Sequence, residues 1–164
     1  MFCPRTRVEV SSDEDGFAGA WFAATVIEKL DKDKYLIEYE SLRNDDDTEF
    51  LREVADTLHV RPYPPNCVVD SFKAFEEVDA LYNDGWWVGT IVKVLGKQKY
   101  KVYFRGTDEE MVFKHSDLRK HQDWIDGRWV IPSQAVMEGG GGGTGSCFLL
   151  LATVVSLFGD AASH

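Results

Sequence analysis

The sequence predicts an all-β protein built from two small, strongly bent five-stranded barrels in tandem. Apolar and β-branched residues alternate with polar ones through residues 83–104, a pattern typical of paired strands with a turn between them. An upstream stretch repeats this pattern without a gap. Trp21 and Tyr35 are fourteen residues apart, and so are Trp86 and Tyr100. We therefore interpret the chain as a tandem repeat of one β unit.

The length of the chain supports two such units. Each repeat has roughly 60 residues, a size at which a domain buries only about 60% of its unfolded surface, so we expect the two repeats to pack together. Strongly bent five-stranded barrels of this size are one way to remove exposed sheet edges. Prolines in residues 62–66 mark the boundary between the units. We predict one barrel in residues 1–63, a second barrel with its linker in 64–133, and a glycine linker and hydrophobic tail, disordered or weakly structured, in 134–164.

The elements of the two repeats follow in the same order. Each repeat begins with a short alternating strand and a polar loop, continues with the two long strands, and ends with a turn, a fourth strand and a short closing element: residues 8–10, 11–16, 20–27, 34–39, 42–51 and 58–62 in the first, and 78–81, 82–85, 86–94, 99–104, 106–113 and 117–119 in the second. The first loop is about five residues longer in the first repeat, and extra loop length often serves binding. Residues 67–75 fit either a strand or a short docking segment.

Composition limits the classes of function. The chain has 164 residues, with 44% hydrophobic and 13% aromatic residues and a net charge of −10, which argues against tight non-specific binding of nucleic acid and suits a basic partner. The charge is uneven, because residues 1–66 carry −7 and residues 67–134 carry −1. The three cysteines form neither a disulfide framework nor a metal motif, which indicates a reducing compartment. The histidines lack ligand spacing, so we predict no metal, no cofactor and no catalytic site.

The C-terminal region differs in composition from the repeats. Residues 139–143 are all glycine, which is typical of a flexible linker, and residues 147–158 are almost entirely apolar. Twelve residues are too few to cross a bilayer core that needs about 20. The segment fits either an appended terminus without stable structure or a membrane-surface or partner-binding segment, and we predict that the protein does not insert into a membrane.

Several motifs together resemble the plant Agenet domain, a Tudor-like member of the Royal superfamily. They are residues 15–22, with Gly-x-Trp, residues 37–42, Val60-Arg61-Pro62, residues 83–89, with Trp-Trp, and residues 118–124. The resemblance covers roughly residues 5–133 and implies a tandem pair of Tudor-like barrels. Similar pairs bind methylated lysine on histone tails, including the heterochromatic lysine-nine mark of histone three. The resemblance therefore implies a non-enzymatic chromatin reader in the nucleus that acts in transcriptional regulation or silencing.

A methylated ammonium keeps its charge and is recognised by aromatic faces, with about 0.5–2 kcal/mol for each cation–π contact. Strand alternation puts Phe22 at a barrel mouth, with Tyr39 at the end of the neighbouring strand. We predict a methyl-lysine cage made of Phe22, Tyr39, Trp21 as a third wall, and Asp45 as the carboxylate. We predict that a second acidic set contacts the flanking basic residues of the peptide: Asp13, Glu14, Asp15 and Asp46.

The second repeat offers an equivalent set, which we regard as a possible second cage: Trp87, Phe104, Tyr82 and Asp108. The stronger negative charge of the first repeat favours its cage as the principal site, because a histone tail is basic. Two other interpretations stay open. The aromatic residues could be core packing and the acidic runs solvated loops, in which case the barrels form a non-enzymatic protein-interaction scaffold. A nucleic-acid-binding role is less favoured because of the net charge.

Overall fold

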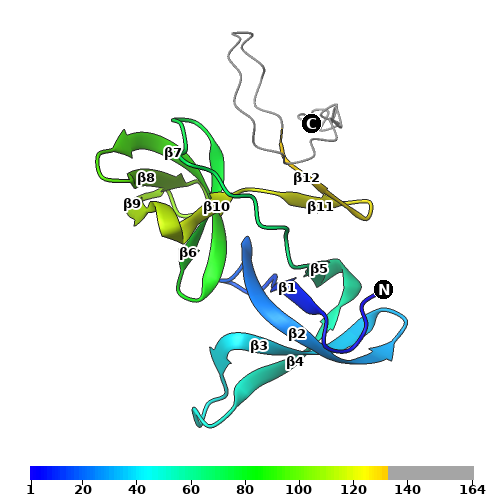
Figure 1. Ribbon diagram of the computed structural model, residues 1–164. Helices are drawn as coiled ribbons and strands as arrows, with labels where there is room; N and C mark the ends of the chain where they lie inside the picture. The colour runs from blue at the N-terminus through cyan, green and yellow to red at the C-terminus, as the bar shows by residue number, and fades with distance from the viewer. Residues whose placement is uncertain (133–164) are drawn as a thin grey trace, which may run out of the picture. The chain divides into compact units, whose positions relative to one another are not determined.

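The computed structural model describes residues 1–132 (Figure 1). The fold is all-β, with two bent five-stranded Tudor-like sheets in tandem, as predicted. Both repeats belong to one compact unit, Met1–His121. Within residues 1–132 no helix is long and apolar enough to cross a membrane. The predicted glycine linker and hydrophobic tail lie outside the described residues, and the predicted domain limits at residues 63 and 133 stay a prediction.

The first repeat forms an antiparallel sheet in the strand order β5-β1-β2-β3-β4. A single 3₁₀ turn, η1, precedes the last strand, and Asp56 caps it by accepting a hydrogen bond from the Leu58 amide at 2.9 Å. The long strands curve through irregular pairing after Val26, where one residue is left out of register. The elements are β1 (Arg7–Ser11), β2 (Ala20–Asp31), β3 (Lys34–Arg43), β4 (Phe50–Asp56), η1 (Thr57–His59) and β5 (Val60–Pro62).

The second repeat has the same order, β10-β6-β7-β8-β9, and an irregularity at the equivalent place, after Ile91. Its elements are β6 (Glu77–Tyr82), β7 (Gly85–Leu95), β8 (Lys99–Phe104), β9 (Glu109–Lys114), η2 (His115–Asp117) and β10 (Leu118–Lys120). The repeats differ in the length of the loop that follows their first strand. The paired residues Val10 and Phe22 are twelve positions apart, whereas Ala80 and Trp87 are seven apart, so the first loop is five residues longer, as predicted.

The segment at residues 67–75 is not a strand but a docking segment. Phe72 is buried in the second core, its amide donates a hydrogen bond to the Tyr100 hydroxyl at 3.2 Å, and the two rings meet edge to face. The first repeat contains the same device, because Phe2 contacts Tyr35 in the same way, with an amide-to-hydroxyl distance of 3.2 Å. Each repeat therefore begins with a short segment that covers the equivalent tyrosine, Tyr35 or Tyr100, about five residues before its first strand.

The two cores have small residues at equivalent interior positions. Ala24 is fully buried in the first core, and Gly89 occupies the equivalent position in the second. A Cβ atom on Gly89 would lie 2.4 Å from the Val102 side chain. The interior of the second repeat therefore has no room for a methyl group at this position, although the first repeat accommodates that of Ala24, because protein interiors are close-packed.

The two repeats are joined through their long strands. The start of β2 pairs with the start of β7 through Ala20–Trp87 and Trp21–Trp86. Trp87 packs against the core of the first repeat. A Cβ atom on Gly85 would lie only 2.9 Å from the ring of Phe22. This joint confirms that the repeats pack together, and it explains why glycine occupies position 85.

Charged side chains are buried beside this joint. Glu9 pairs with Arg61 of its own repeat, with an Nη2–Oε1 distance of 2.8 Å, and Asp79 pairs with Arg119 at 2.9 Å. Arg119 also reaches Glu9 across the joint, with Nη1 2.8 Å from Oε2, and His121 Nδ1 lies 2.6 Å from Asp79. These pairs supply the compensation that buried charges need.

A short hairpin follows the second repeat, in the unit that begins at Gln122. It consists of β11 (Asp123–Ile125) and β12 (Arg128–Val130), which form three residue pairs and are joined by a two-residue turn. Trp124 and Trp129 lie opposite each other with ring centroids 5.3 Å apart. Trp124 therefore has a packing role within the hairpin.

Candidate functional site

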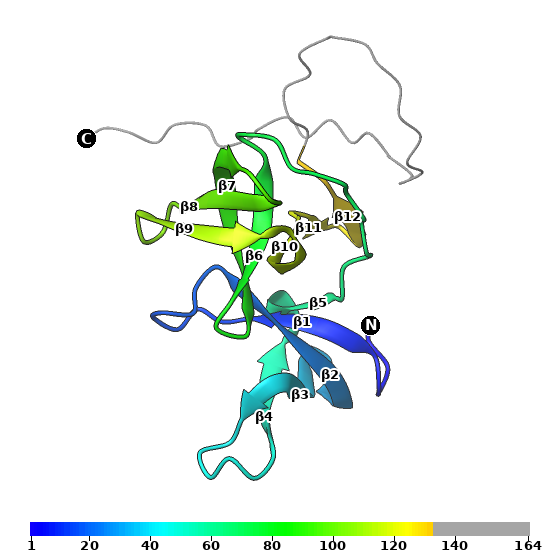
Figure 2. The ribbon, with the colours of Figure 1, turned by 60° about the vertical axis from the view of Figure 1, so that its left-hand side comes forward.

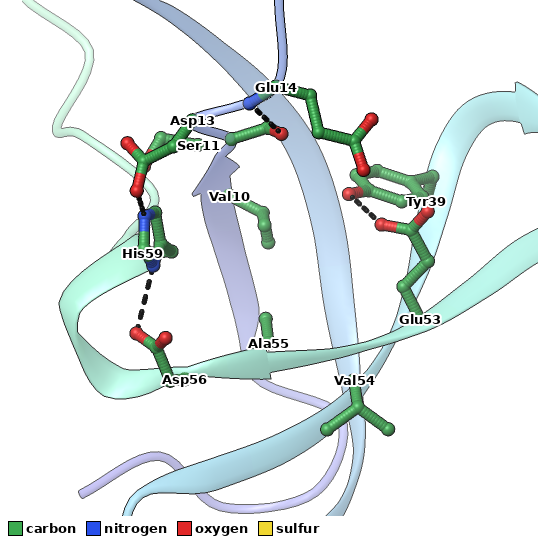
Figure 3. A pocket seen from close by; sticks show the side chains of 11 residues that line it. Val10, Ser11, Asp13, Glu14, Tyr39, Glu53, Val54, Ala55, Asp56 and His59 are labelled. Carbon is green, nitrogen blue, oxygen red and sulfur yellow. Dashed lines mark hydrogen bonds and ion pairs between the residues drawn. The ribbon is translucent and has the colours of Figure 1, made fainter. Parts of the chain in front are cut away.

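A pocket of about 440 Å³ lies in the first repeat (Figure 3). Three elements form it: the end of β1 with its long following loop, the middle of β3, and β4 with η1. The combination brings carboxylates from two separate segments, the loop after β1 and strand β4, into one pocket with one aromatic side chain. The lining residues are Val10, Ser11, Ser12, Asp13, Glu14, Tyr39, Glu53, Val54, Ala55, Asp56 and His59.

Tyr39 is the aromatic residue of the pocket. Its hydroxyl donates a hydrogen bond to Glu53 Oε2 at 2.8 Å (Figure 3), and the residue is only 6% exposed. Burial, and next the contact with Glu53, raise the pKa of Tyr39, so the hydroxyl stays neutral. The bond fixes the Glu53 carboxylate at the edge of the ring, while its second oxygen can accept a further hydrogen bond.

Two phenylalanines continue from Tyr39. Phe22 meets Tyr39 edge to face with ring centroids 6.3 Å apart, and Phe17, on the long loop, meets Phe22 in the same way at 6.1 Å. Phe22 is 5% exposed and is not among the residues that line the pocket, whereas Phe17 is 46% exposed. The structure therefore brings Phe22 and Tyr39 together as predicted, but it puts Phe22 behind Tyr39, in the core.

His59 ties the long loop to the rest of the pocket. Its Nδ1 lies 2.9 Å from Asp56 Oδ1 and its Nε2 lies 2.8 Å from Asp13 Oδ2. A neutral imidazole has one N–H, so only the imidazolium donates to both carboxylates. The hydrogen bonds to Asp56 and, next, to Asp13 raise the pKa of His59. The hydrogen bond between His59 and Asp56 also lowers the pKa of Asp56. Protonated His59 thus links the loop to η1.

Some predicted residues of the first site lie elsewhere. Trp21 points to the face of β2 opposite Phe22, where the Arg61 guanidinium lies 3.8 Å from its ring centroid, so it is not a wall of this pocket. Asp45 and Asp46 are exposed in the β3–β4 loop and do not line the pocket. Asp13 and Glu14 do line it, and Asp15 does not.

The predicted second set is not brought together. Trp87 packs on the core of the first repeat and donates its Nε1–H to the Tyr82 carbonyl at 2.9 Å. Phe104 packs edge to face on Phe113 in the second core. Asp108 accepts a hydrogen bond from the Tyr103 hydroxyl at 2.8 Å, which raises the pKa of that tyrosine. These residues therefore serve the joint, the core and a surface turn.

Sequence reasoning missed Glu53, Asp56, His59 and Phe17. The first three depend on the register of β4, which the sequence of the β3–β4 loop does not fix. Phe17 lies in the Gly16-Phe17-Ala18-Gly19 stretch, and its exposure in a long loop is the signal that could have identified it.

The pocket is suited to a cation. Four carboxylates surround one neutral tyrosine and one histidine, and the acidic groups are Asp13, Glu14, Glu53 and Asp56. Within residues 1–132, no group of three or more His, Cys, Asp or Glu side chains is arranged to hold a metal ion. An organic cation that combines positive charge with apolar surface would match both the carboxylates and the ring of Tyr39.

Comparison with known proteins identifies the repeats. The Agenet domain family model matches residues 5–65 and 76–135. A protein of Arabidopsis thaliana described as Agenet domain (AGD)-containing P1 is 47% identical over 132 residues, which are 80% of this chain and 26% of that protein. DUF724 domain-containing protein 3 of the same plant is 37% identical over 131 residues, which are 76% of this chain and 19% of the relative. The chain thus spans about a quarter or less of these relatives.

Two solved structures have the same architecture. The crystal structure of the Arabidopsis thaliana AGDP1 AGD34 superimposes with a TM-score of 0.77 at 47% identity, covering 80% of this chain and 90% of that one. The ADCP1 tandem Agenet domain 3-4 gives a TM-score of 0.73 at 43% identity, with coverage of 81% and 89%. The chain therefore belongs to the Agenet domain family, whose Tudor-like modules read chromatin, are typically non-enzymatic, and generally bind proteins or histone peptides.

Proposed function

We propose that this chain is a nuclear chromatin reader that binds a methylated lysine of a histone tail in the pocket of its first repeat. The heterochromatic lysine-nine mark of histone three is the mark we propose first, with a role in transcriptional regulation or silencing. The observation that carries the proposal is the position of Tyr39, which lines a pocket of about 440 Å³ together with four carboxylates. In the second repeat, Phe104 and Met111 occupy the positions of Tyr39 and Glu53, so the hydroxyl and its carboxylate partner are both replaced there.

Tyr39 and Glu53 divide the recognition between them. The ring supplies the cation–π contact, and Phe17 is the exposed aromatic side chain from which a loop movement could make a second wall. Glu53 would accept the remaining N–H of a dimethylated lysine, since the hydroxyl of Tyr39 occupies only one of its oxygens. Asp13, which is bonded to His59, and Glu14, whose carboxylate lies beside Tyr39 (Figure 3), would attract the basic residues that flank the methylated lysine.

Titration calorimetry with a histone-three tail peptide, methylated or unmodified at lysine nine, tests this proposal. We expect micromolar affinity, about −7 to −8 kcal/mol, for the methylated peptide. Tyr39→Ala should weaken its binding by about 1–3 kcal/mol. Phe104→Ala is the matched control, because Phe104 is the equivalent residue of the second repeat, and it should leave the affinity unchanged. Trp87→Ala is a poor control, because Trp87 supports the first core.

Two further variants separate the roles. Tyr39→Phe keeps the ring and should retain most of the affinity, whereas Glu53→Gln should reduce the preference for dimethylated over trimethylated lysine. Equal binding of methylated and unmodified peptides would contradict the cage and leave only an acidic surface. If Phe104→Ala weakened binding as much as Tyr39→Ala does, the proposal that the site lies in the first repeat alone would be contradicted.

A further inference from the structure

The outer face of the second repeat carries a group of lysines, although the net charge of the chain is negative. Three neighbouring strands, β7, β8 and β9, lie side by side (Figure 2). Lys93 pairs with Lys101, and Lys99 pairs with Lys114. Paired residues of an antiparallel sheet point to the same face. The buried residues of β8 are Tyr100 and Val102, so the lysines that alternate with them point outward. We call these four residues the lysine face.

The lysine face is compact. Lys99 and Lys101, which each belong to one of the two pairs, are two positions apart along β8, so the pairs are separated by about 7 Å. Lys101 and Lys114 have side-chain exposures of 38% and 65%, and Lys93 and Lys99 are exposed as well. Two carboxylates lie nearby: Glu110 is 3.7 Å from Lys101, and Asp117 is 4.0 Å from Lys114. Surface ion pairs of this length contribute about 0–1 kcal/mol, so they would yield to a stronger anion.

The internal repeat shows that this charge is not a property of the fold. The register of the first repeat puts Glu28 at the position of Lys93, Leu36 at that of Lys101, and Asp56 at that of Lys114. Only Lys99 has a basic equivalent, Lys34. The same surface is therefore acidic in one repeat and basic in the other, and a requirement of the sheet cannot explain the difference.

We propose that the lysine face binds the phosphodiester backbone of duplex nucleic acid without reading its sequence. Lysine ammonium groups act as point charges toward phosphate. Binding of single strands relies on several aromatic rings that stack with successive bases, whereas the four positions of the lysine face carry no ring. The acidic first repeat opposes this binding, but its field is screened beyond about 10 Å at 0.1 M salt. The proposal does not depend on the methyl-lysine site.

The predicted strength is that of a non-specific contact. A protein that neutralises Z phosphates has a slope of about −0.9Z in a plot of log affinity against log salt, so four lysines give at most about −3.6. Removing three of them should bring the slope to about −0.9. Non-specific dissociation constants of about 10⁻⁴–10⁻⁶ M are typical at physiological salt, so the measurement should begin at low salt.

Fluorescence anisotropy with a labelled duplex of arbitrary sequence tests the proposal on the full chain. The variant replaces Lys93, Lys101 and Lys114 with glutamine and should lose at least about tenfold in affinity at 50 mM salt. The control replaces Lys29, Lys32 and Lys34 of the first repeat with glutamine. Its net charge changes by the same amount, so it should bind nearly as the original chain does. Thermal melting of both variants establishes that they fold.

Three results would overturn the proposal. Retention of duplex binding by the lysine-face variant would show that the face is not used. Equal losses in the two variants would show that net charge alone governs binding. Equally tight binding of a poly-glutamate peptide would indicate a general anion surface that suits an acidic protein. Calorimetry with the methylated histone peptide should give the same affinity for the original chain and the lysine-face variant, which separates this surface from the pocket.

Discussion

Replacing Glu9 with glutamine tests whether the buried charges hold the two repeats together. Glu9 is fully buried, and its Oε1 accepts hydrogen bonds from Arg61 at 2.8 and 3.1 Å and from Arg119 at 3.1 Å. Its Oε2 lies 2.8 Å from Arg119 Nη1. Glutamine keeps the shape but loses the charge and turns an amide N–H₂ toward a guanidinium. Two arginines would then share the single carboxylate of Asp79.

Removing one partner of a buried ion pair costs about 3–5 kcal/mol, because the other charge stays buried without compensation. We expect a loss of this size in the free energy of unfolding for Glu9→Gln. It would be a large share of the 5–15 kcal/mol that is usual for a folded domain. Urea denaturation measures it. The control is Glu40→Gln, which removes the exposed pair of Glu40 with Arg7 and should cost less than about 1 kcal/mol.

The two variants decide the matter together. If Glu9→Gln costs no more than Glu40→Gln, the buried network is not a source of stability, and the reasoning is refuted. A double-mutant cycle between Glu9 and Arg119 then isolates the contact across the joint, for which we expect a coupling energy of about 0.5–3 kcal/mol. A coupling energy near zero would mean that each repeat is stabilised by its own pair alone.

Two further predictions concern packing and pH. Gly89→Ala puts a methyl group 2.4 Å from Val102 and should lower the melting temperature, with a cost of about 1–3 kcal/mol, whereas Gly96→Ala, with open space around it, should be nearly neutral; equal effects would contradict the packing argument. The pKa of His59 is raised in the folded protein, so its contribution to stability should be complete below about pH 6.5, the unfolded value, and should disappear as pH rises through the folded value. The stability difference between the original chain and His59→Gln, measured by denaturation, should therefore be larger at acidic than at alkaline pH. A difference independent of pH would contradict the stabilising bonds of protonated His59 to Asp13 and Asp56.

Much of the fold could be predicted because the two repeats can be aligned with each other, and this alignment matches their strands residue by residue. The gapless match of the long strands aligns Ala24 with Gly89, which the structure buries at equivalent positions, and the loop before it was predicted to be longer in the first repeat. Alternation identifies the two faces of a strand, but it does not reveal what covers each face. Glu9 alternates with apolar neighbours as an exposed residue would, yet the joint buries it completely.

The candidate site was harder to predict because it depends on contacts between distant segments. Tyr39 was identified from its place at the end of the strand next to that of Phe22, but the carboxylate that it contacts was not. In the first repeat Tyr35 and its partner Ala55 are twenty positions apart, whereas the equivalent pair in the second repeat, Tyr100 and Phe113, is thirteen apart. The extra residues shift β4 in sequence, so only the pairing itself reveals that Glu53 reaches the Tyr39 hydroxyl and that Asp45 is out of place.

The pattern of likeness between the repeats separates structural from functional positions. One pair of residue types that both repeats keep lies at the joint: an arginine lies over a tryptophan in each, Arg61 over Trp21 at 3.8 Å and Arg119 over Trp86 at 4.2 Å. Where charge is reversed, as between Asp56 and Lys114, the side chains reach the surface. A joint made of equivalent residues holds the repeats together through shared chemistry, which leaves the two outer surfaces free to acquire opposite charge. That division is what a module needs if one repeat is to bind a basic peptide and the other an acidic polymer.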